Sequence, residues 1–491
     1  MKVFIITEGS KNIGFGHITR CLSLYQAFEE RKIIPELIIN GDGTIKDLLK
    51  GVNYQILNWL DEKGKLFKKV KDADIAIIDS YLADISFYNT LSDLVRLAVY
   101  IDDNKRLDYP KGVVVNGSIY AEELNYPKKD GVKYLLGPKY IPLRKEFWKV
   151  PEKEIRENIE SIMITFGGDD MRNMTPKVLG FLRENYPGLK KNVIVGKAFQ
   201  NIDEIKKNAD KNTNLIYYPD ANKMKKVMLE SDIAISAGGQ TLYELARVGV
   251  PTIGICVAEN QLRNVKGWEK TGFLEYAGWY VENNLIQKIY NSIRYLEDVN
   301  VRKSKPKIGR KFIDGKGSMR IVGLLLFDLL KHKLIFREAN FKDALEIFNL
   351  SNDDVVRKSS FNQRKIQWKD HLKWLKEKLE DENCVFFVVV DKLNKFYGQV
   401  RFDINPKNSE ATISISLKNN IRGLGLSSFI IDKSVSRLVE VKNVRLIKAY
   451  IKEENIASIK AFEKANFKFL EDLIFKESQA KLYIREVKDG I

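Results

Sequence analysis

The chain opens with short apolar runs separated by longer stretches in which apolar residues recur at helical spacing. The runs are 3–7, 37–40, 75–79, 97–101, 113–116 and 134–136. Short runs rich in Val and Ile are typical of strands that are buried on both faces of a parallel sheet. Strands that alternate with helices indicate βαβ units, so residues 1–145 predict a doubly wound, Rossmann-like α/β domain.

A second series of the same kind follows a connection marked by Pro138, Pro142 and Pro151. Its apolar runs are 162–166, 192–195, 215–217, 233–236 and 252–256. A basic stretch at 301–311 reads as a loop, and a helix is expected from about 316 to 331. Residues 146–331 therefore predict a second Rossmann-like domain, and two such domains in succession imply a cleft in which a ligand binds.

The pattern changes from residue 334 onwards. A strand at 334–337 and helical stretches at 340–349 and 366–379 precede three strands in direct succession, at 385–390, 397–403 and 411–417. A glycine-rich loop, a helix, a strand at 446–450, a helix at 456–464 and a closing strand pair complete the chain. Adjacent strands with segregated helices predict an α+β domain over 332–491. Three domains suit a chain of 491 residues.

Composition predicts a globular protein of a reducing compartment. Hydrophobic residues make up 44% of the chain, enough for packed cores. The cysteines, Cys21, Cys256 and Cys384, are far apart and form no metal-ligand spacing. No apolar stretch approaches the roughly 18 residues of a membrane span, and charge interrupts the first apolar run too soon for a signal peptide. We expect a cytoplasmic protein with no membrane partner.

The formal net charge of +17 raises the question of nucleic-acid binding. The lysines, however, are interleaved with Glu and Asp along helical stretches such as 63–71 and 365–378, which is typical of solvated helix faces. The sequence predicts no nucleic-acid partner. A positive excess also attracts anionic substrates such as nucleotides.

The first candidate site is the loop Gly14-Phe15-Gly16-His17, between an apolar strand and a helix. Glycines there permit a positive φ and close approach of the backbone to a ligand. A histidine at a helix N-terminus feels the positive end of the dipole, which favours the neutral imidazole that a general base needs. The alternative is a helix-capping loop with an incidental histidine.

The second candidate site is the run Ser236-Ala237-Gly238-Gly239-Gln240-Thr241, which follows a strand and precedes a helix. Backbone N–H groups at such a helix start bind phosphates. Glu244 lies one turn further on, where its carboxylate can accept hydrogen bonds from two ribose hydroxyls. This order of residues predicts a nucleotide site.

These loops belong to an ordered set of motifs. The set comprises Gly14, Gly16, His17 and Arg20, then 78–81, 101–103, 166–170, 236–239, 259–261 and 314–317. Over about residues 1–330 the set resembles the UDP-2,4-diacetamido-2,4,6-trideoxy-β-L-altropyranose hydrolases of pseudaminic acid biosynthesis. That family has the GT-B fold, two Rossmann-like domains facing a cleft.

The resemblance implies hydrolytic release of UDP with inversion at the anomeric carbon, and it implies no metal. His17 matches the family's general base, and Tyr81 and Asn260 match positions that line the sugar and the reaction centre. UDP or substrate binding is implied for Gly14, Gly16, Arg20, Gly238, Gly239, Gln240, Thr241, Glu244 and Gln261. Asp79, Asp102 and Asp103 are either sugar ligands or strand-end caps.

The third candidate site is Arg422-Gly423-Leu424-Gly425-Leu426-Ser427, whose alternating glycines free consecutive amides to grip a pyrophosphate. A tight β–α turn is the alternative. Together with Asn455 and the helix after it, the loop resembles the GNAT N-acetyltransferases over about 334–491, with acetyl-CoA bound by 422–427 and Asn455. Phe462 stands where a proton-donating Tyr is common, which leaves Tyr450 as one candidate acid, and Asn466 replaces the usual Gly.

Residues 351–361 with Arg357, His371 and Trp374 look like the GNAT branch that acts on nucleotide-linked amino sugars. A helix face packed on the sheet is the alternative for His371 and Trp374. The two resemblances together predict a bifunctional enzyme that N-acetylates the 4-amino group of a UDP-linked 4-amino-4,6-dideoxy-altrosamine and then releases UDP. A GT-B glycosyltransferase fused to an acetyltransferase is the alternative, and a non-catalytic basic scaffold is a third.

Overall fold

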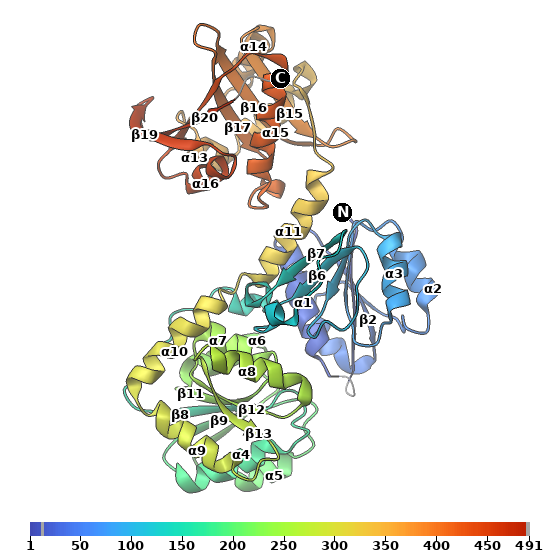
Figure 1. Cartoon of the computed structure of the whole chain (residues 1–491), viewed down its shortest axis with the longest axis vertical. Helices are drawn as coiled ribbons and strands as arrows, with labels where there is room; N and C mark the ends of the chain where they lie inside the picture. The colour runs from blue at the N-terminus through green and yellow to red at the C-terminus, as the bar shows by residue number, and fades with distance from the viewer. Residues whose placement is uncertain (11–13, 488–491) are drawn as a thin grey trace. The chain divides into compact units, whose positions relative to one another are not determined.

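The computed structural model describes residues 1–10 and 14–487 and divides into two compact units, Met1–Val322 and Gly323–Ile491. The first unit holds two parallel sheets, which we call the first and second lobes, and the second unit holds one mixed sheet (Figure 1). The predicted fold class, a pair of parallel α/β sheets followed by an α+β domain, is confirmed. Within the described residues, no helix has the length and apolarity needed to cross a membrane.

The first lobe is a seven-stranded parallel sheet in the order β3-β2-β1-β4-β5-β6-β7. Its strands are β1 (Val3–Gly9), β2 (Glu36–Gly41), β3 (Tyr54–Ile56), β4 (Ile75–Asp79), β5 (Ala98–Ile101), β6 (Gly112–Asn116) and β7 (Val132–Leu136), and its helices are α1 (Gly16–Glu29), α2 (Lys63–Val70) and α3 (Ile85–Leu94). The predicted apolar runs lie in these strands, except that Leu97 precedes β5 by one residue. The short edge strand β3 was not predicted, because its three residues are only half-buried and carry no apolar run.

The second lobe is a six-stranded parallel sheet in the order β10-β9-β8-β11-β12-β13. Its strands are β8 (Ser161–Thr165), β9 (Lys190–Val195), β10 (Thr213–Tyr217), β11 (Ile233–Ala237), β12 (Thr252–Cys256) and β13 (Leu274–Trp279). Its helices are α4 (Met174–Asn185), α5 (Ile202–Asn208), α6 (Ala221–Glu230), α7 (Thr241–Val248), α8 (Leu262–Lys270), α9 (Leu285–Leu296) and α10 (Val299–Phe312), with α11 (Gly317–Lys331) next in the chain. The strand β13 escaped prediction because Glu275 and Gly278 interrupt its apolar residues.

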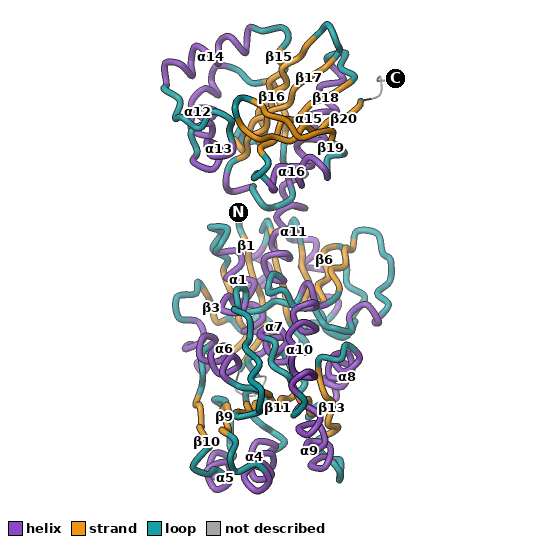
Figure 2. Tube along the Cα trace, turned by 90° about the vertical axis from the view of Figure 1, so that its left-hand side faces the viewer, coloured by secondary structure: helices purple, strands orange, loops and turns teal. Residues whose placement is uncertain are grey.

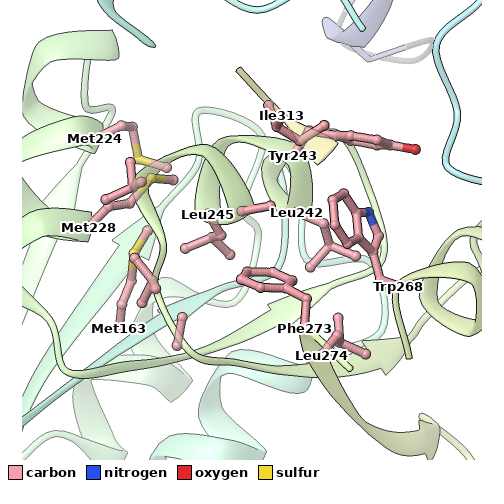
Figure 3. Close-up of a cluster of buried hydrophobic side chains, with 14 of the residues drawn as sticks. Met163, Met224, Met228, Leu242, Tyr243, Leu245, Trp268, Phe273, Leu274 and Ile313 are labelled. Carbon is pink, nitrogen blue, oxygen red and sulfur yellow. The ribbon is translucent and has the colours of Figure 1, made fainter. Parts of the chain in front are cut away.

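One core of the second lobe fixes the helix α7. Leu242 and Leu245 of this helix are fully buried, and Figure 3 shows them between a methionine group and an aromatic group. The labelled members of these groups are Met163, Met224 and Met228, and Trp268 and Phe273. The start of α7 is therefore held rigidly by packing, which matters because the predicted nucleotide loop leads into it.

The basic stretch at 301–311, expected to be a loop, is instead part of α10. The prediction was wrong because the cations of this stretch are held by groups that lie elsewhere in the chain. Arg302 is fully buried and donates hydrogen bonds to the carbonyls of Leu296, Glu297, Arg156 and Glu157. Lys305 donates to the carbonyl of Gly272 at 2.7 Å. These tertiary contacts hold the segment as a helix although Pro306 removes one of its backbone donors.

The second unit is a seven-stranded sheet in the order β14-β15-β16-β17-β18-β20-β19. Its strands are β14 (Ile335–Glu338), β15 (Cys384–Val390), β16 (Phe396–Asn405), β17 (Glu410–Leu417), β18 (Leu446–Lys452), β19 (Lys468–Phe475) and β20 (Ser478–Glu486), and its helices are α12 (Ala344–Ser351), α13 (Asp354–Ser359), α14 (Trp368–Glu380), α15 (Leu426–Val441) and α16 (Ile456–Lys464). Figure 2 shows α12, α13 and α14 grouped beside this sheet. The strands β17 and β18 are parallel and pair over only three residues each, 410–412 with 446–448.

Candidate active sites

The middle of the first sheet positions the first candidate site. The strand order reverses its direction of growth between β1 and β4, and doubly wound sheets bind ligands at the carboxyl ends of strands at such a point. Asp79 is the last residue of β4 and pairs in register with Thr7 of β1. The loop after β1 leads into α1, whose second residue is His17. The two side chains therefore meet at this edge of the sheet.

His17 and Asp79 form a close pair. The distance from His17 Nδ1 to Asp79 Oδ1 is 2.6 Å, and the Asp79 side chain is 1% exposed. Because a carboxylate only accepts hydrogen bonds, Nδ1 carries the proton and donates it, and the lone pair of Nε2 is left available. An imidazole oriented by a buried carboxylate is the arrangement of a general base in hydrolytic sites.

The surroundings of His17 act against the helix N-terminus, which favours the neutral imidazole. Burial lowers the pKa of His17, but the charge and hydrogen bond of Asp79, with a contribution from Glu8, leave that pKa above its usual value. Burial alone would raise the pKa of Asp79, but Arg20 and His17 hold it well below its usual range. His17 is thus a stronger base than its backbone position alone indicates.

Arg20 connects this pair to Tyr81. Its Nε and Nη2 donate to the two oxygens of Asp79, each at 2.7 Å, and its Nη1 donates to Asp103 at 2.6 Å. The hydroxyl of Tyr81 donates to the other oxygen of Asp103 at 2.6 Å. The Tyr81 ring lies edge-on to the His17 ring, with centroids 4.7 Å apart. The structure thus brings His17, Arg20 and Tyr81 into one network.

The structure shows which groups bind Asp79, Asp102 and Asp103, the three aspartates for which two roles were possible. Asp79 is occupied by His17 and Arg20, and Asp103 holds Arg20 and Tyr81. Asp102 accepts a hydrogen bond from the hydroxyl of Tyr126 at 2.5 Å and caps its own loop. A direct contact of Arg20 with substrate stays a prediction, since its guanidinium is engaged by these carboxylates.

Of the two loop glycines, only Gly14 has a positive φ, and a Cβ at Gly14 or Gly16 would meet no atom of the described residues within 4 Å. The loop therefore borders open space beside His17. Residues 11–13 of this loop lie outside the described residues.

Glu8 is a member of the site that sequence reasoning missed. It is 1% exposed, and its Oε1 accepts a hydrogen bond from the backbone N–H of Tyr81 at 2.7 Å. The available signal was an acidic residue inside an apolar strand that leads directly into the glycine-rich loop. Glu8 fixes the backbone that carries Tyr81 and adds negative charge near His17.

In the second lobe, the strand order reverses its direction of growth between β8 and β11, as it does between β1 and β4 in the first. Gly238 follows β11, donates its N–H to Gln261 Oε1 at 3.0 Å and accepts from Asn264 at 2.7 Å. A Cβ on Gly238 would lie 2.6 Å from Val265 Cγ1, whereas a Cβ on Gly239 would meet nothing within 4 Å. Gly238 is thus required by packing, and Gly239 borders open space at the start of α7.

The remaining predicted residues of this lobe surround the same helix start. Thr241 is the first residue of α7, and Gln240 donates to the carbonyl of Pro142 at 3.0 Å. Glu244 is 4% exposed and is paired with Arg144, a residue that the sequence analysis did not select. Asn260 is exposed on the short helical turn Glu259–Gln261. Binding of UDP by these residues stays a prediction.

The glycine loop of the second unit leads into the 16-residue helix α15. Gly423 and Gly425 both have positive φ, +71° and +80°, and Leu424 and Leu426 are buried anchors. Arg422 pairs with Asp353 at 3.0 Å. Ser427 is the second residue of α15, so its backbone amide lies at the helix start. Asn455 caps α16 by accepting a hydrogen bond from the N–H of Ser458.

Where β17 and β18 diverge, the edge of β17 beyond residue 412 is unpaired by β18. Such an edge can hydrogen-bond an extended ligand. Phe462 is buried against Phe467 and has no proton to donate, while Tyr450 stacks on Phe475 with centroids 4.1 Å apart.

The structure favours packing over substrate contact for His371. It is 1% exposed, lies between Trp368 and Trp374, and donates from Nε2 to the carbonyl of Ala344 at 2.9 Å. Burial lowers the pKa of His371. Arg357 donates to the carbonyls of 362 and 364 and so braces its own loop. Substrate contact by Arg357, His371 and Trp374 stays a prediction.

We expect Gly423→Val and Gly425→Val to weaken acetyl-CoA binding by at least about tenfold, because a β-branched residue at positive φ costs roughly 1–2 kcal/mol or distorts the loop. Calorimetry with acetyl-CoA measures the change. Gly323→Val is the matched control, since Gly323 has open space around it and no positive φ. Unchanged affinity in both loop variants would remove this loop from the cofactor site.

Comparison with known families agrees with the two-part architecture. Residues 333–468 match the acetyltransferase (GNAT) domain model, and residues 162–314 match the glycosyltransferase family 28 C-terminal domain model. The mixed sheet thus belongs to a GNAT domain, and the second lobe to a glycosyltransferase-type domain. An uncharacterized protein of Methanocaldococcus jannaschii is 26% identical over 95% of this chain and 97% of its own length.

Two relatives are named as the hydrolase that the sequence motifs resemble. The UDP-2,4-diacetamido-2,4,6-trideoxy-β-L-altropyranose hydrolase of Campylobacter jejuni is 23% identical over 56% of this chain and 99% of its own length. The pseudaminic acid cytidylyltransferase and UDP-2,4-diacetamido-2,4,6-trideoxy-β-L-altropyranose hydrolase of Helicobacter pylori is 26% identical over 56% of this chain and 48% of its own. Both matches cover just over half of this chain, and the GNAT model matches residues 333–468.

Proposed function

We propose that the chain is a bifunctional enzyme of pseudaminic acid biosynthesis. The GNAT domain N-acetylates the 4-amino group of a UDP-linked 4-amino-4,6-dideoxy-altrosamine, and the two lobes of the first unit release UDP from UDP-2,4-diacetamido-2,4,6-trideoxy-β-L-altropyranose. The observation that carries the hydrolase half is the His17–Asp79 pair at the carboxyl edge of the first sheet. The names of the two relatives supply the substrate.

In the hydrolytic step, the oxygen of a water attacks C1 of the sugar and the bond from C1 to the UDP oxygen breaks. Nε2 of His17 takes the proton of the attacking water, and Asp79 stabilises the imidazolium that forms. The backbone amides at the start of α7, around Gly239, face the charge that develops on the departing diphosphate. Tyr81, held beside His17 by Asp103, lines the sugar.

In the acetyl transfer, the neutral 4-amino group attacks the thioester carbonyl of acetyl-CoA. A C–N bond forms and the C–S bond breaks. The attacking nitrogen releases one proton to water, and the CoA thiolate takes one proton. The amides from Gly423 to Ser427 at the start of α15 bind the pyrophosphate of acetyl-CoA. Since Phe462 is buried and has no proton to give, Tyr450 or a water provides the proton.

The test is a product analysis. The full chain is incubated with the UDP-linked 4-amino sugar and acetyl-CoA, and the expected products are CoA, UDP and the free 2,4-diacetamido sugar. Without acetyl-CoA the release of UDP should be small. Formation of CoA without any UDP would contradict the hydrolase half.

A glycosyltransferase fused to the acetyltransferase is the second candidate, and the match of residues 162–314 to a glycosyltransferase family favours it. A glycosyltransferase transfers the sugar to an acceptor other than water and hydrolyses the nucleotide sugar only slowly. Rapid UDP release with water as the sole acceptor therefore separates the two candidates.

We place the three domains at 1–145, 146–331 and 332–491, and we expect a chain that ends at Lys331 to retain UDP release within about threefold. This truncation keeps α11 whole, including Ser318 and Arg320, which donate to the carbonyls of Leu143 and Lys139. The rate of UDP release from the diacetylated substrate measures the effect. A folded truncation without activity would show that the hydrolase site needs the GNAT domain.

A further inference from the structure

The link between the two lobes, residues 137–149, is held by one face of α7. Gln240, Glu244 and Arg247 are three to four residues apart, so they project from the same side of the helix. Gln240 donates to a carbonyl of the link, and Arg247 donates to the carbonyls of residues 147 and 148 at 3.0 and 2.9 Å. Glu244, which lies between Gln240 and Arg247 on this side of the helix, accepts two hydrogen bonds from Arg144 of the link. The helix α7, which begins at the predicted nucleotide loop, is therefore hydrogen-bonded to the link along one side.

The contact between Arg144 and Glu244 has the two-pronged geometry of a planar guanidinium on a carboxylate. Nε of Arg144 donates to one oxygen of Glu244 at 2.8 Å, and Nη2 donates to the other at 2.7 Å. The plane of the carboxylate is therefore fixed. Each carboxylate oxygen has a second lone pair, so both can still accept one more hydrogen bond.

Of the groups around Glu244, Arg144 is the one that favours the ionised form, although the pKa of Glu244 stays above its usual value. Burial raises the pKa of Glu244, and Glu146 of the link acts in the same direction, while Arg144 opposes both. Arg247 donates to link carbonyls, and Arg310 of α10 donates to the carbonyls of residues 151 and 248, so both guanidinium groups are engaged elsewhere. Without Arg144, the buried carboxyl would hold its proton to a higher pH.

We propose that Arg144 is a positioning residue of the nucleotide site, which keeps Glu244 as an oriented, ionised acceptor for the two vicinal ribose hydroxyls of UDP. The inference rests on the proposed function, in which Glu244 binds the ribose. Two hydroxyls that both donate need two acceptor oxygens in a fixed plane, and a protonated carboxyl offers fewer acceptors and itself donates.

The test measures the Kd of UDP by calorimetry on the full chain between pH 7 and pH 9. In the native chain the affinity should be nearly constant over this range. Arg144→Met should bind UDP roughly 10- to 30-fold more weakly at pH 7. Its affinity should recover as the pH rises, because the carboxylate of Glu244 forms again. Arg144→Lys, which retains a cation, should show a smaller loss.

Two matched variants distinguish this role from a structural one. Glu244→Gln should lose UDP affinity equally at every pH, and Arg247→Met, which loosens the same link without touching Glu244, should show no pH dependence. Native affinity in Arg144→Met, or a loss that is the same at pH 7 and pH 9, would overturn the inference. Failure of the native chain to bind UDP at any pH would instead refute the proposed nucleotide site, and the inference with it.

Discussion

A His17→Asn enzyme should release UDP roughly 10²–10⁴ times more slowly than the native enzyme, the usual contribution of a general base. Asparagine keeps much of the size and can still donate to Asp79, but it cannot take a proton from water near neutral pH. The corresponding rise in the barrier is about 3–5 kcal/mol. KM should change little, because in the proposed function UDP is bound mainly through Glu244 and Gly239 of the other lobe. Steady-state kinetics with the diacetylated substrate measures both constants.

Two controls belong to this experiment. The rate of acetyl transfer in the same His17→Asn protein should be unchanged, which shows that the second unit is folded, and thermal unfolding checks the first unit, which contains position 17. His332→Asn, at an exposed histidine just after α11, should leave both activities at the native level. A near-native kcat in His17→Asn would rule out the base, and a rise in KM alone would make His17 a binding residue.

Asp79→Asn should reduce kcat by roughly 10- to 10³-fold and should also move the pH profile. The Asn side chain can still accept from Nδ1, so the ring orientation survives, but the imidazolium formed during proton transfer loses its counter-charge. Because Asp79 raises the pKa of His17 against the effect of burial, its removal should lower that pKa. A base acts only when deprotonated, so the acid limb of kcat/KM should shift to lower pH than in the native enzyme.

Asp102→Asn is the control for this shift, since Asp102 is equally buried on the adjacent strand end but bonds Tyr126 and its own loop. Its acid limb should stay in place. Thermal unfolding of each variant checks that the protein is folded, because Asp79 also pairs with Arg20. Lower activity with an unmoved acid limb in Asp79→Asn would contradict coupling between the two side chains.

The fold was predictable where one strand or helix carries its own pattern. The buried strands of both parallel sheets are continuous apolar runs, and the glycine loops stand at their ends. The edge strand β3 has no such pattern because it is half-buried, and β13 is interrupted by Glu275 and Gly278. The helix α10 was mistaken for a loop because burial of Arg302 depends on carbonyls that belong to other segments.

The loops of the candidate sites could be predicted from the sequence, but the distant residues that contact them could not. His17, Tyr81 and Glu244 stand in motifs that can be read locally. The residues that give them their chemistry are distant in sequence: Asp79 lies 62 residues from His17, and Arg144 lies 100 residues from Glu244. No local sequence pattern indicates that two distant side chains will come into contact at a sheet edge. The role of Asp79 was therefore left open, and Arg144 and Glu8 were not predicted.

Gly238 and Gly239, at the start of α7, are under different structural constraints. A side chain at Gly238 would collide with Val265, whereas one at Gly239 would enter empty space. Packing therefore requires glycine at 238 but not at 239, where the proposed diphosphate of UDP would be the reason for it. If the start of α7 binds the nucleotide as proposed, relatives that have lost this binding should vary at 239 while 238 stays glycine, and comparing the two positions would separate active from inactive lineages.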